Sequence, residues 1–446
     1  MDPEETRRIV KDTNYVTWRR QGGWEPLVIA RAAGSKFWDA SGKEYLDFSS
    51  QLIATNLGHG NAAVAEAIAN QARELAYAAP GFATEARAAL SSALVDVLPP
   101  GLSRFFFSTS GTEANEAALK IARTVTGRSK VVARYRSYHG STAASISVTG
   151  EFRRRASERV QKVPGTVFAP DCYCYRCPLG LTYPDCDVAC AEYVEYQLEH
   201  EGDVAAMIIE PVVGTNGVIV PVPEYLPRIR AITEKHNVLL IADEVMSGWG
   251  RVGEWFAVNH WNVRPDILTT AKGITGAQIP LGLTATTPAI HDAFREAYFP
   301  HGHTYEAHPL TLAPGVAAIG EYRRLGLIEK SRKDGEHLLA RLREIQTRHR
   351  SVGEVRGLGL FCAVELVKNR TTREPFNTED DKMAGRPLLV DQVTAAMLKE
   401  SVFCIGWVSH LIVAPPLIVT PEELDHGLEV LDRALELADA KADPPS

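Results

Sequence analysis

A carboxylate and a lysine, Asp243 and Lys272, are the residues of this sequence best placed to do chemistry, because each follows a short apolar run. The first run, Val238 to Ala242, shows no alternation of polar and apolar residues, which is typical of a strand buried on both faces of a parallel sheet. Open α/β sheets bind ligands at the carboxyl ends of their strands, where Asp243 stands. The second run, Ile267 to Leu268, leads to Lys272 and a turn at Gly273. We expect the two side chains to face one site.

Such a pair suits the two polar anchors of pyridoxal 5'-phosphate. The acid Asp243 would keep the pyridinium nitrogen protonated, so that the ring acts as an electron sink, and Lys272 would carry the aldehyde carbon as an imine. A lysine held partly desolvated, with a lowered pKa, is the form that reacts in this way. The alternative is that Asp243 caps a loop and Lys272 is a solvated surface charge.

A third feature is a junction between a strand and a helix. The strand expected at residues 104–107 is followed by a Ser/Gly/Thr-rich turn and by an Ala-rich helix that runs to Arg123. Free backbone N–H groups and the positive end of the helix dipole make such a junction an anion site. We predict that Ser110, Gly111 and Thr112 bind the phosphate. The alternative is ordinary N-capping by serine or threonine.

Two further expected strands end in residues that could contact a cofactor. The strand at residues 130–133 leads to Tyr138 and His139, and the strand at residues 204–209 leads to Glu210. Tyr138 could lie flat on the cofactor ring, where offset stacking contributes about 1 kcal/mol. His139 is either a neighbour in that stack or a loop residue. We count all three among the cofactor-binding candidates.

The elements that would position these residues form a repeated order of strand, loop and helix. That order predicts an α/β fold with a mostly parallel, doubly wound sheet. We expect this sheet in a large cofactor-binding domain at residues 61–322. A smaller α+β domain would be built from both ends of the chain, namely from residues 1–60, which include a hairpin around residues 36–48, and from residues 323–446. The charged stretch at residues 379–387 is expected to be a surface loop.

Composition narrows the class of protein. The chain has 446 residues, 45% of them hydrophobic and 23% charged, with a net charge of −7, which is an ordinary globular balance. No basic stripe interleaves with aromatics, so we expect no nucleic-acid partner. The longest basic run, Arg153 to Arg155, is expected to be a solvated face or an anion contact. No apolar run reaches the roughly 18 residues of a membrane span, and the acidic start does not resemble a signal peptide. We therefore expect no membrane partner and a cytoplasmic location.

Five of the seven cysteines crowd into one stretch. These are Cys172, Cys174, Cys177, Cys186 and Cys190. An odd total without a secretory signal argues against a disulfide framework. Cys174 and Cys177 have the spacing of metal ligands, but the spacing of Cys186 and Cys190 is looser and no histidine is interspersed. We predict a compact loop of mostly reduced, partly buried thiols and no metal; a zinc or iron-sulfur site is the alternative.

Taken together, the sequence resembles the class III aminotransferases, which have the type I fold of pyridoxal-phosphate enzymes, over essentially its whole length. Short stretches in a fixed order carry the resemblance: Ser110 to Glu116, Tyr138 to Gly140, Glu210 to Pro211, Asp243 to Val245, Ala271 to Gly273, Gly302 to Tyr305 and Ala414 to Leu417. The resemblance implies that Lys272 is the Schiff-base lysine and then the base and acid of the proton shift. It also implies that Asp243 pairs with the pyridinium nitrogen.

The same resemblance implies two roles that the residues alone do not suggest. Val245 would pack under the cofactor ring, opposite Tyr138. Thr304 would reach the phosphate of the cofactor in the neighbouring subunit, which makes a homodimer the smallest active unit and leaves a tetramer open.

The sequence departs from the family at one position. Members that bind a substrate carboxylate with arginine often carry it two residues before Ala414, where this chain has Ile412. Other candidates for this task are Arg153 to Arg155, Arg356, Arg19 and His410. We therefore predict ping-pong transfer from an ω-amino donor (β-alanine, taurine, γ-aminobutyrate, a diamine or a simple amine) to pyruvate or 2-oxoglutarate. The alternative is an isomerase (aminomutase or racemase) or a decarboxylase at the same site, since the fold does not dictate which bond breaks.

Overall fold

Seven strands form the central sheet of the computed structural model, which describes residues 1–158 and 162–444. The order across the sheet is β4-β10-β9-β8-β7-β5-β6. From β9 to β6 all neighbours run parallel, and β10 is antiparallel to both of its neighbours. The expected mostly parallel sheet is thus confirmed. Its strands are β4 (Arg104–Ser108), β5 (Lys130–Arg134), β6 (Thr166–Ala169), β7 (Val204–Ile209), β8 (Leu239–Asp243), β9 (Ile267–Thr270) and β10 (Gly282–Thr286).

Helices cover both faces of this sheet. Successive residues of a strand point to opposite faces, so neighbouring side chains pack against different helices. α5 (Gly111–Thr126) shares a hydrophobic cluster with Ile208. The next residue, Ile209, belongs to the cluster of α8 (Ala189–Glu201) and α9 (Tyr225–Lys235) on the other face. The fully buried strands therefore read as continuous apolar runs in the sequence.

Three helices lie beside β4 and β10. They are α3 (Ala62–Glu74), α4 (Glu85–Val95) and α11 (Pro309–Arg324), and α11 packs against the other two. Short helices complete this part of the chain: α2 (Ser50–Ile53), α6 (Ala143–Ser147), α7 (Phe152–Ser157) and α10 (Pro288–Asp292), with 3₁₀ turns at Cys174–Arg176, Ala257–Trp261 and Lys272–Thr275.

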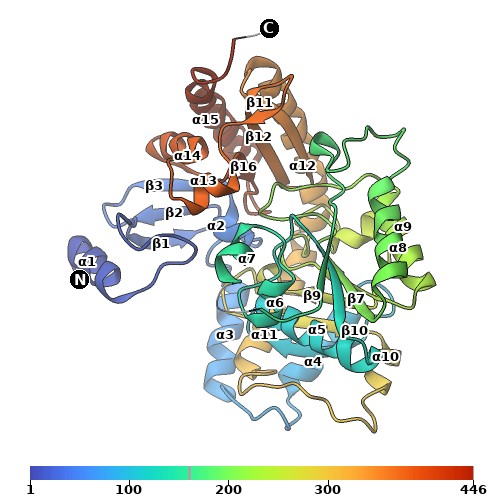
Figure 1. Ribbon diagram of the computed structural model, residues 1–446. Helices are drawn as coiled ribbons and strands as arrows, with labels where there is room; N and C mark the ends of the chain where they lie inside the picture. Colours follow the sequence, from blue (N-terminus) through green and yellow to red (C-terminus); the bar gives the residue numbers. More distant parts are fainter. Residues whose placement is uncertain (159–161, 445–446) are drawn as a thin grey trace.

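A second, antiparallel sheet lies at the top of Figure 1 with the C-terminal helices. Its strands are β11 (Val352–Leu358), β12 (Phe361–Asn369), β13 (Glu374–Pro375), β15 (Ile405–Trp407) and β16 (His410–Val413). The helices are α12 (Leu327–Arg348), α14 (Leu389–Lys399) and α15 (Pro421–Asp439). Buried leucines of α12 and α15 join the same hydrophobic cluster as the inner side chains of β12 and β16.

A third sheet unites the two ends of the chain. The antiparallel strands β1 (Ile29–Ala33), β2 (Lys36–Asp39) and β3 (Glu44–Asp47) include the expected hairpin. β14 (Val402–Phe403) pairs with β3 in parallel. Figure 1 shows the N-terminal strands, in blue, beside α14, with α1 (Pro3–Thr13) at their outer side. The domain boundaries at residues 60 and 322 stay a prediction.

The prediction of a loop at residues 379–387 is wrong for the first five residues, which form the helix α13 (Glu379–Met383). The helix starts with a capping box. Thr378 accepts a hydrogen bond from the N–H of Asp381, and the Asp381 carboxylate accepts one from the N–H of Thr378. Such a box stabilises a helix start by pairing two otherwise free donors. None of the described helices is long and apolar enough to cross a lipid bilayer.

Candidate active site

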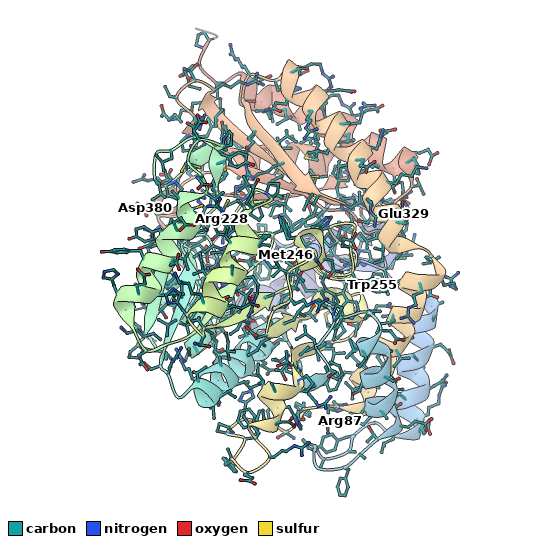
Figure 2. All side chains as sticks on the ribbon, turned by 90° about the vertical axis from the view of Figure 1, so that its right-hand side faces the viewer. Arg87, Arg228, Met246, Trp255, Glu329 and Asp380 are labelled. Atoms are coloured by element: carbon teal, nitrogen blue, oxygen red, sulfur yellow. The ribbon has the colours of Figure 1, made fainter. Side chains whose placement is uncertain are left out.

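Asp243 and Lys272 lie at the ends of neighbouring strands. β8 and β9 run parallel, with Asp243 opposite Thr269, so their carboxyl ends open on the same side. Both side chains line one cavity of about 370 Å³. Met246, which also lines this cavity, lies near the middle of Figure 2, whereas Arg87 lies at the periphery. The same cavity brings together these further candidates: Ser110, Gly111, Thr112, Tyr138, His139, Glu210 and Val245.

Three donors hold the buried carboxylate of Asp243. His139 Nδ1 lies 2.7 Å from Asp243 Oδ2, and Asn115 Nδ2 donates to the same oxygen at 2.8 Å. The backbone N–H of Val245 donates to Oδ1 at 3.1 Å. A carboxylate fixed in this way has one orientation and keeps lone pairs for a protonated ring nitrogen in the cavity.

Asn115 is the functional residue that sequence reasoning missed. It is buried, and it also donates to the carbonyl of His139 at 2.7 Å and accepts a hydrogen bond from Thr269 Oγ1 at 2.6 Å. The available signal was its place in α5, where a polar residue stands on the apolar face among Ala114, Ala118 and Ile121. A buried amide on such a face needs polar partners, and here they belong to the site.

Lys272 occupies a strained and partly desolvated position. Its φ is 48°, in the left-handed region, which costs a residue with a Cβ atom roughly 1–3 kcal/mol and is often found at functional sites. Burial lowers the pKa of Lys272 to about 8, against the opposing effect of the nearby carboxylates of Asp243 and Glu210. A larger share of neutral amine at physiological pH is what imine formation requires.

The amino end of α5 lies at the cavity and has unpaired backbone N–H donors within the described residues. Ser110 caps the helix by accepting a hydrogen bond from the N–H of Glu113 at 3.2 Å. Within the described residues, the N–H groups of Gly111 and Thr112 donate to no protein acceptor. A Cβ atom on Gly111 would lie 2.7 Å from both γ-carbons of Val245, so only glycine fits there. Free donors, the helix dipole and a bare backbone together fit a phosphate group.

Glu210 positions two loops that border the cavity. Its Oε1 accepts a hydrogen bond from the N–H of Tyr138 at 2.9 Å, and its Oε2 accepts one from the N–H of Gly214 at 2.8 Å. Burial raises the pKa of Glu210. The side chain thus fixes the backbone that carries Tyr138.

A buried arginine stands beside the cavity wall. The Arg153 guanidinium carbon lies 3.7 Å from the centroid of the Tyr138 ring and 4.6 Å from that of Trp407. Its Nη2 donates to Thr215 Oγ1 at 3.0 Å. With an exposed fraction of 5%, Arg153 does not belong to the solvated face that its basic run suggested. The expectation of a solvated face is wrong here, because α7 turns this side chain inward, whereas Arg155 is partly exposed.

The other candidates for a substrate carboxylate are less well placed. Arg356 is engaged by Glu354, by Glu365 and by the carbonyl of Gly217. Burial lowers the pKa of His410 to about 4, so its imidazole is neutral at physiological pH. Ile412 is buried in a hydrophobic cluster. Arg19 is exposed.

Thr304 does not line the cavity of its own chain. Its carbonyl accepts a hydrogen bond from the Tyr77 hydroxyl at 3.2 Å. Nearby aromatic side chains are exposed, including Tyr77 (44%) and Tyr305 (59%).

The cysteine-rich stretch holds free thiols. Cys172 is buried, Cys174 is exposed and the other three are intermediate. Within residues 1–158 and 162–444, one group of three potential metal ligands lies together, Glu195, Glu199 and His236, and it includes no cysteine.

Comparison with known proteins identifies the family. The family model for class III aminotransferases matches residues 19–435. The taurine–pyruvate aminotransferase of Rhodobacter capsulatus is 34% identical over 430 residues, which cover 92% of this chain and 92% of that protein. The leucine/methionine racemase of Thermococcus litoralis is 34% identical over 440 residues, which cover 97% of this chain and 94% of that protein.

Solved structures agree. The taurine:2-oxoglutarate aminotransferase of Bifidobacterium kashiwanohense, solved in complex with pyridoxal phosphate and glutamate, matches with a TM-score of 0.94 and 36% identity, and the match covers 99% of both chains. The fold is therefore that of the type I pyridoxal-phosphate enzymes. Within that class, the chain belongs to the class III aminotransferase family, and its cofactor is pyridoxal 5'-phosphate.

Proposed function

We propose that this aminotransferase takes an amino group from an ω-amino donor, such as β-alanine, taurine, γ-aminobutyrate, a diamine or a simple amine, and passes it to pyruvate or 2-oxoglutarate by a ping-pong mechanism. The observation that carries the proposal is the buried guanidinium of Arg153 beside Tyr138, together with an apolar Ile412 at the position where relatives often carry an arginine. The names of relatives that act on taurine with pyruvate or 2-oxoglutarate support it.

Each lining residue has a task in this scheme. When bound, the cofactor supplies an electron sink next to the substrate carbon. Lys272 Nζ would be the point of covalent attachment and, once free, would accept the proton of that carbon and return it. Asp243, held by His139, would keep the ring nitrogen protonated. Tyr138 and Val245 would hold the ring between them, and Ser110, Gly111 and Thr112 at the amino end of α5 would hold the phosphate. Glu210 holds the Tyr138 loop.

Arg153 binds the acid group of donor or acceptor. Its partner Glu151 is buried, and burial raises the pKa of that carboxyl to about 7. At neutral pH the guanidinium charge is therefore only partly compensated, and a substrate carboxylate or sulfonate can complete the pairing.

We also propose a homodimer as the smallest active unit, with Thr304 at the phosphate of the neighbouring cofactor; a tetramer would be a pair of such dimers. The exposed Tyr77 and Tyr305 near Thr304 support a partner surface. Mixing the Lys272→Ala protein with a Thr304→Tyr protein under exchange conditions tests this. Hybrid dimers would contain one intact site and regain activity. No recovery in verified hybrids contradicts the shared site.

The donor class is tested by half-reactions. The holoenzyme is mixed with single amines, and the absorbance of the lysine-bound cofactor is followed; Lys272→Ala, which lacks the linkage, serves as the control. Loss of this absorbance with β-alanine, taurine or a diamine, reversed by a keto acid, supports the proposal. No loss with any donor argues against it.

A second function has a specific observation in its favour, namely the similarity to a leucine/methionine racemase over 97% of this chain. A racemase returns one isomer and needs no acceptor. Conversion of L-leucine to its D-isomer in the absence of any keto acid would favour that function over amino-group transfer.

A further inference from the structure

Glu151 and Arg153 form a buried ion pair in which, within the described residues, only one of the two carboxylate oxygens accepts hydrogen bonds. Glu151 Oε1 accepts hydrogen bonds from the backbone N–H of Arg153 at 3.2 Å and from its Nε at 2.5 Å. The other oxygen, Oε2, is buried and has no hydrogen-bond partner within the described residues. Glu151 itself is 1% exposed. A buried carboxylate oxygen without a donor is costly when ionised, whereas a protonated oxygen is tolerated more easily.

The described groups that face Glu151 do not supply a donor for its second carboxylate oxygen. Arg153, on its own helix, favours the ionised form, whereas burial and Glu379 of α13 favour the protonated form. The negative charge of Glu151 also acts on Lys382 of α13 and on the hydroxyl of Tyr138. The Lys382 ammonium lies over the Trp407 ring at 4.8 Å, so it does not pair with Glu151 directly. Among the residues that the structure describes, the carboxyl therefore has Arg153 as its only directly paired cation.

A substrate acid group would change that compensation. If a carboxylate or sulfonate binds Arg153, two anions share one guanidinium in a site of low polarity. The net charge becomes negative, and an uncompensated buried charge is strongly unfavourable. Protonation of Glu151 removes the excess negative charge without any movement of the backbone. Oε2 can take the proton, because within the described residues no donor bonds to it.

We propose that Glu151 takes up one proton from solvent when the acid group of a substrate binds Arg153, and so sets the pH range in which carboxylates and sulfonates bind. The inference rests on the proposed role of Arg153 in substrate binding. Glu151 is a positioning residue in this scheme, because it acts through Arg153 and touches no reacting atom. Substrates without an acid group, such as diamines, do not involve it.

The test uses the holoenzyme and propionate, an acid without an amino or keto group. Binding is measured by calorimetry at pH 8 in buffers with different ionisation enthalpies, which gives the number of protons taken up. The wild type is expected to take up close to one proton, and its affinity should fall about tenfold per pH unit above 7. Glu151→Gln should take up none, bind with an affinity independent of pH, and bind about tenfold more tightly than the wild type at pH 8.

Two controls make the outcome specific. Burial also raises the pKa of Glu244 to about 7, but this carboxyl bonds Ser247 and backbone N–H groups instead of an arginine. Glu244→Gln should keep the proton uptake. Glu151→Asp, which retains an ionisable group if the amide variant folds poorly, should also keep it.

The result that overturns the inference is binding of propionate by the wild type without proton uptake, or uptake that persists in Glu151→Gln. A failure of the proposed function looks different, because amine donors would then cause no half-reaction even in the wild type. The rate of the half-reaction with a diamine donor should be the same in Glu151→Gln and in the wild type.

Discussion

His139 Nδ1 and Asp243 Oδ2 lie 2.7 Å apart in the buried wall of the site. This contact joins the loop after β5 to the end of β8, and Asn115 of α5 donates to the same oxygen. The carboxylate that we propose as the partner of the cofactor nitrogen is thus held from two elements. Its orientation does not depend on the ligand, which is the preorganisation that electrostatic catalysis requires.

Asp243→Asn should lower the rate of the amine half-reaction by about 10²- to 10³-fold, because the amide cannot keep the ring nitrogen protonated. Stopped-flow absorbance measures this rate, and the spectrum before mixing shows whether the cofactor is still attached to Lys272. The variant should retain that attachment. A rate close to that of the wild type, with bound cofactor, would contradict the assigned role.

Attachment of the cofactor to the apoenzyme should depend on pH around 8. Burial lowers the pKa of Lys272 to about 8, and only the neutral amine attacks the aldehyde, so the rate should rise with pH and level off above that value. The measurement is the rate of appearance of the lysine-bound absorbance after addition of pyridoxal phosphate. An exposed lysine would still gain rate up to about pH 10, and such a profile would argue against the buried environment.

Gly111→Ala should weaken binding of the cofactor. The new methyl group would lie 2.7 Å from both γ-carbons of Val245, which forces α5 and the Val245 segment apart at the proposed phosphate site. The matched control is Gly320→Ala in α11, where a Cβ atom meets nothing within 4 Å. This second change should leave cofactor affinity unchanged and stabilise the helix by about 0.5–1 kcal/mol. Titration of the two apoproteins with cofactor compares them.

Arg153→Met should raise the KM for pyruvate and 2-oxoglutarate by about 10- to 100-fold, because loss of a charge-assisted hydrogen bond costs roughly 1.5–3 kcal/mol. A diamine donor has no acid group, so its half-reaction should keep the rate of the wild type. Arg155→Met is the control, since Arg155 is partly exposed and pairs with Glu379 and Asp380. Equal effects of the two substitutions would locate the acid-binding group elsewhere.

Much of the site could be predicted because it follows from the ends of strands. Val238 to Ala242 and Ile267 to Leu268 read as buried strands, and parallel neighbours bring their ends together. The turn that carries Ser110 was visible for the same reason, since it joins a strand to a helix. These signals are local in sequence and need no knowledge of packing.

The remaining parts depend on contacts between distant segments. Trp407 comes from β15, yet it stacks with Arg153 of α7, and no periodicity in either segment indicates this. The inward turn of Arg153 within a run of three arginines could not be read either, because a basic run has the same composition whether it is solvated or buried. The start of α13 is different, since it could have been predicted from the sequence, where Thr378 and Asp381 have the spacing of a capping box.

The sheet that unites both ends of the chain has a consequence for how the protein is made. Leu46 of β3 pairs with Val402 of β14, 356 positions later. At about 5–20 residues per second, a ribosome needs roughly 20 to 70 s to supply that partner strand. During this interval the N-terminal hairpin has an open edge that can pair with other chains. The edge of β3 therefore lacks its partner strand until the chain has been synthesised as far as Val402.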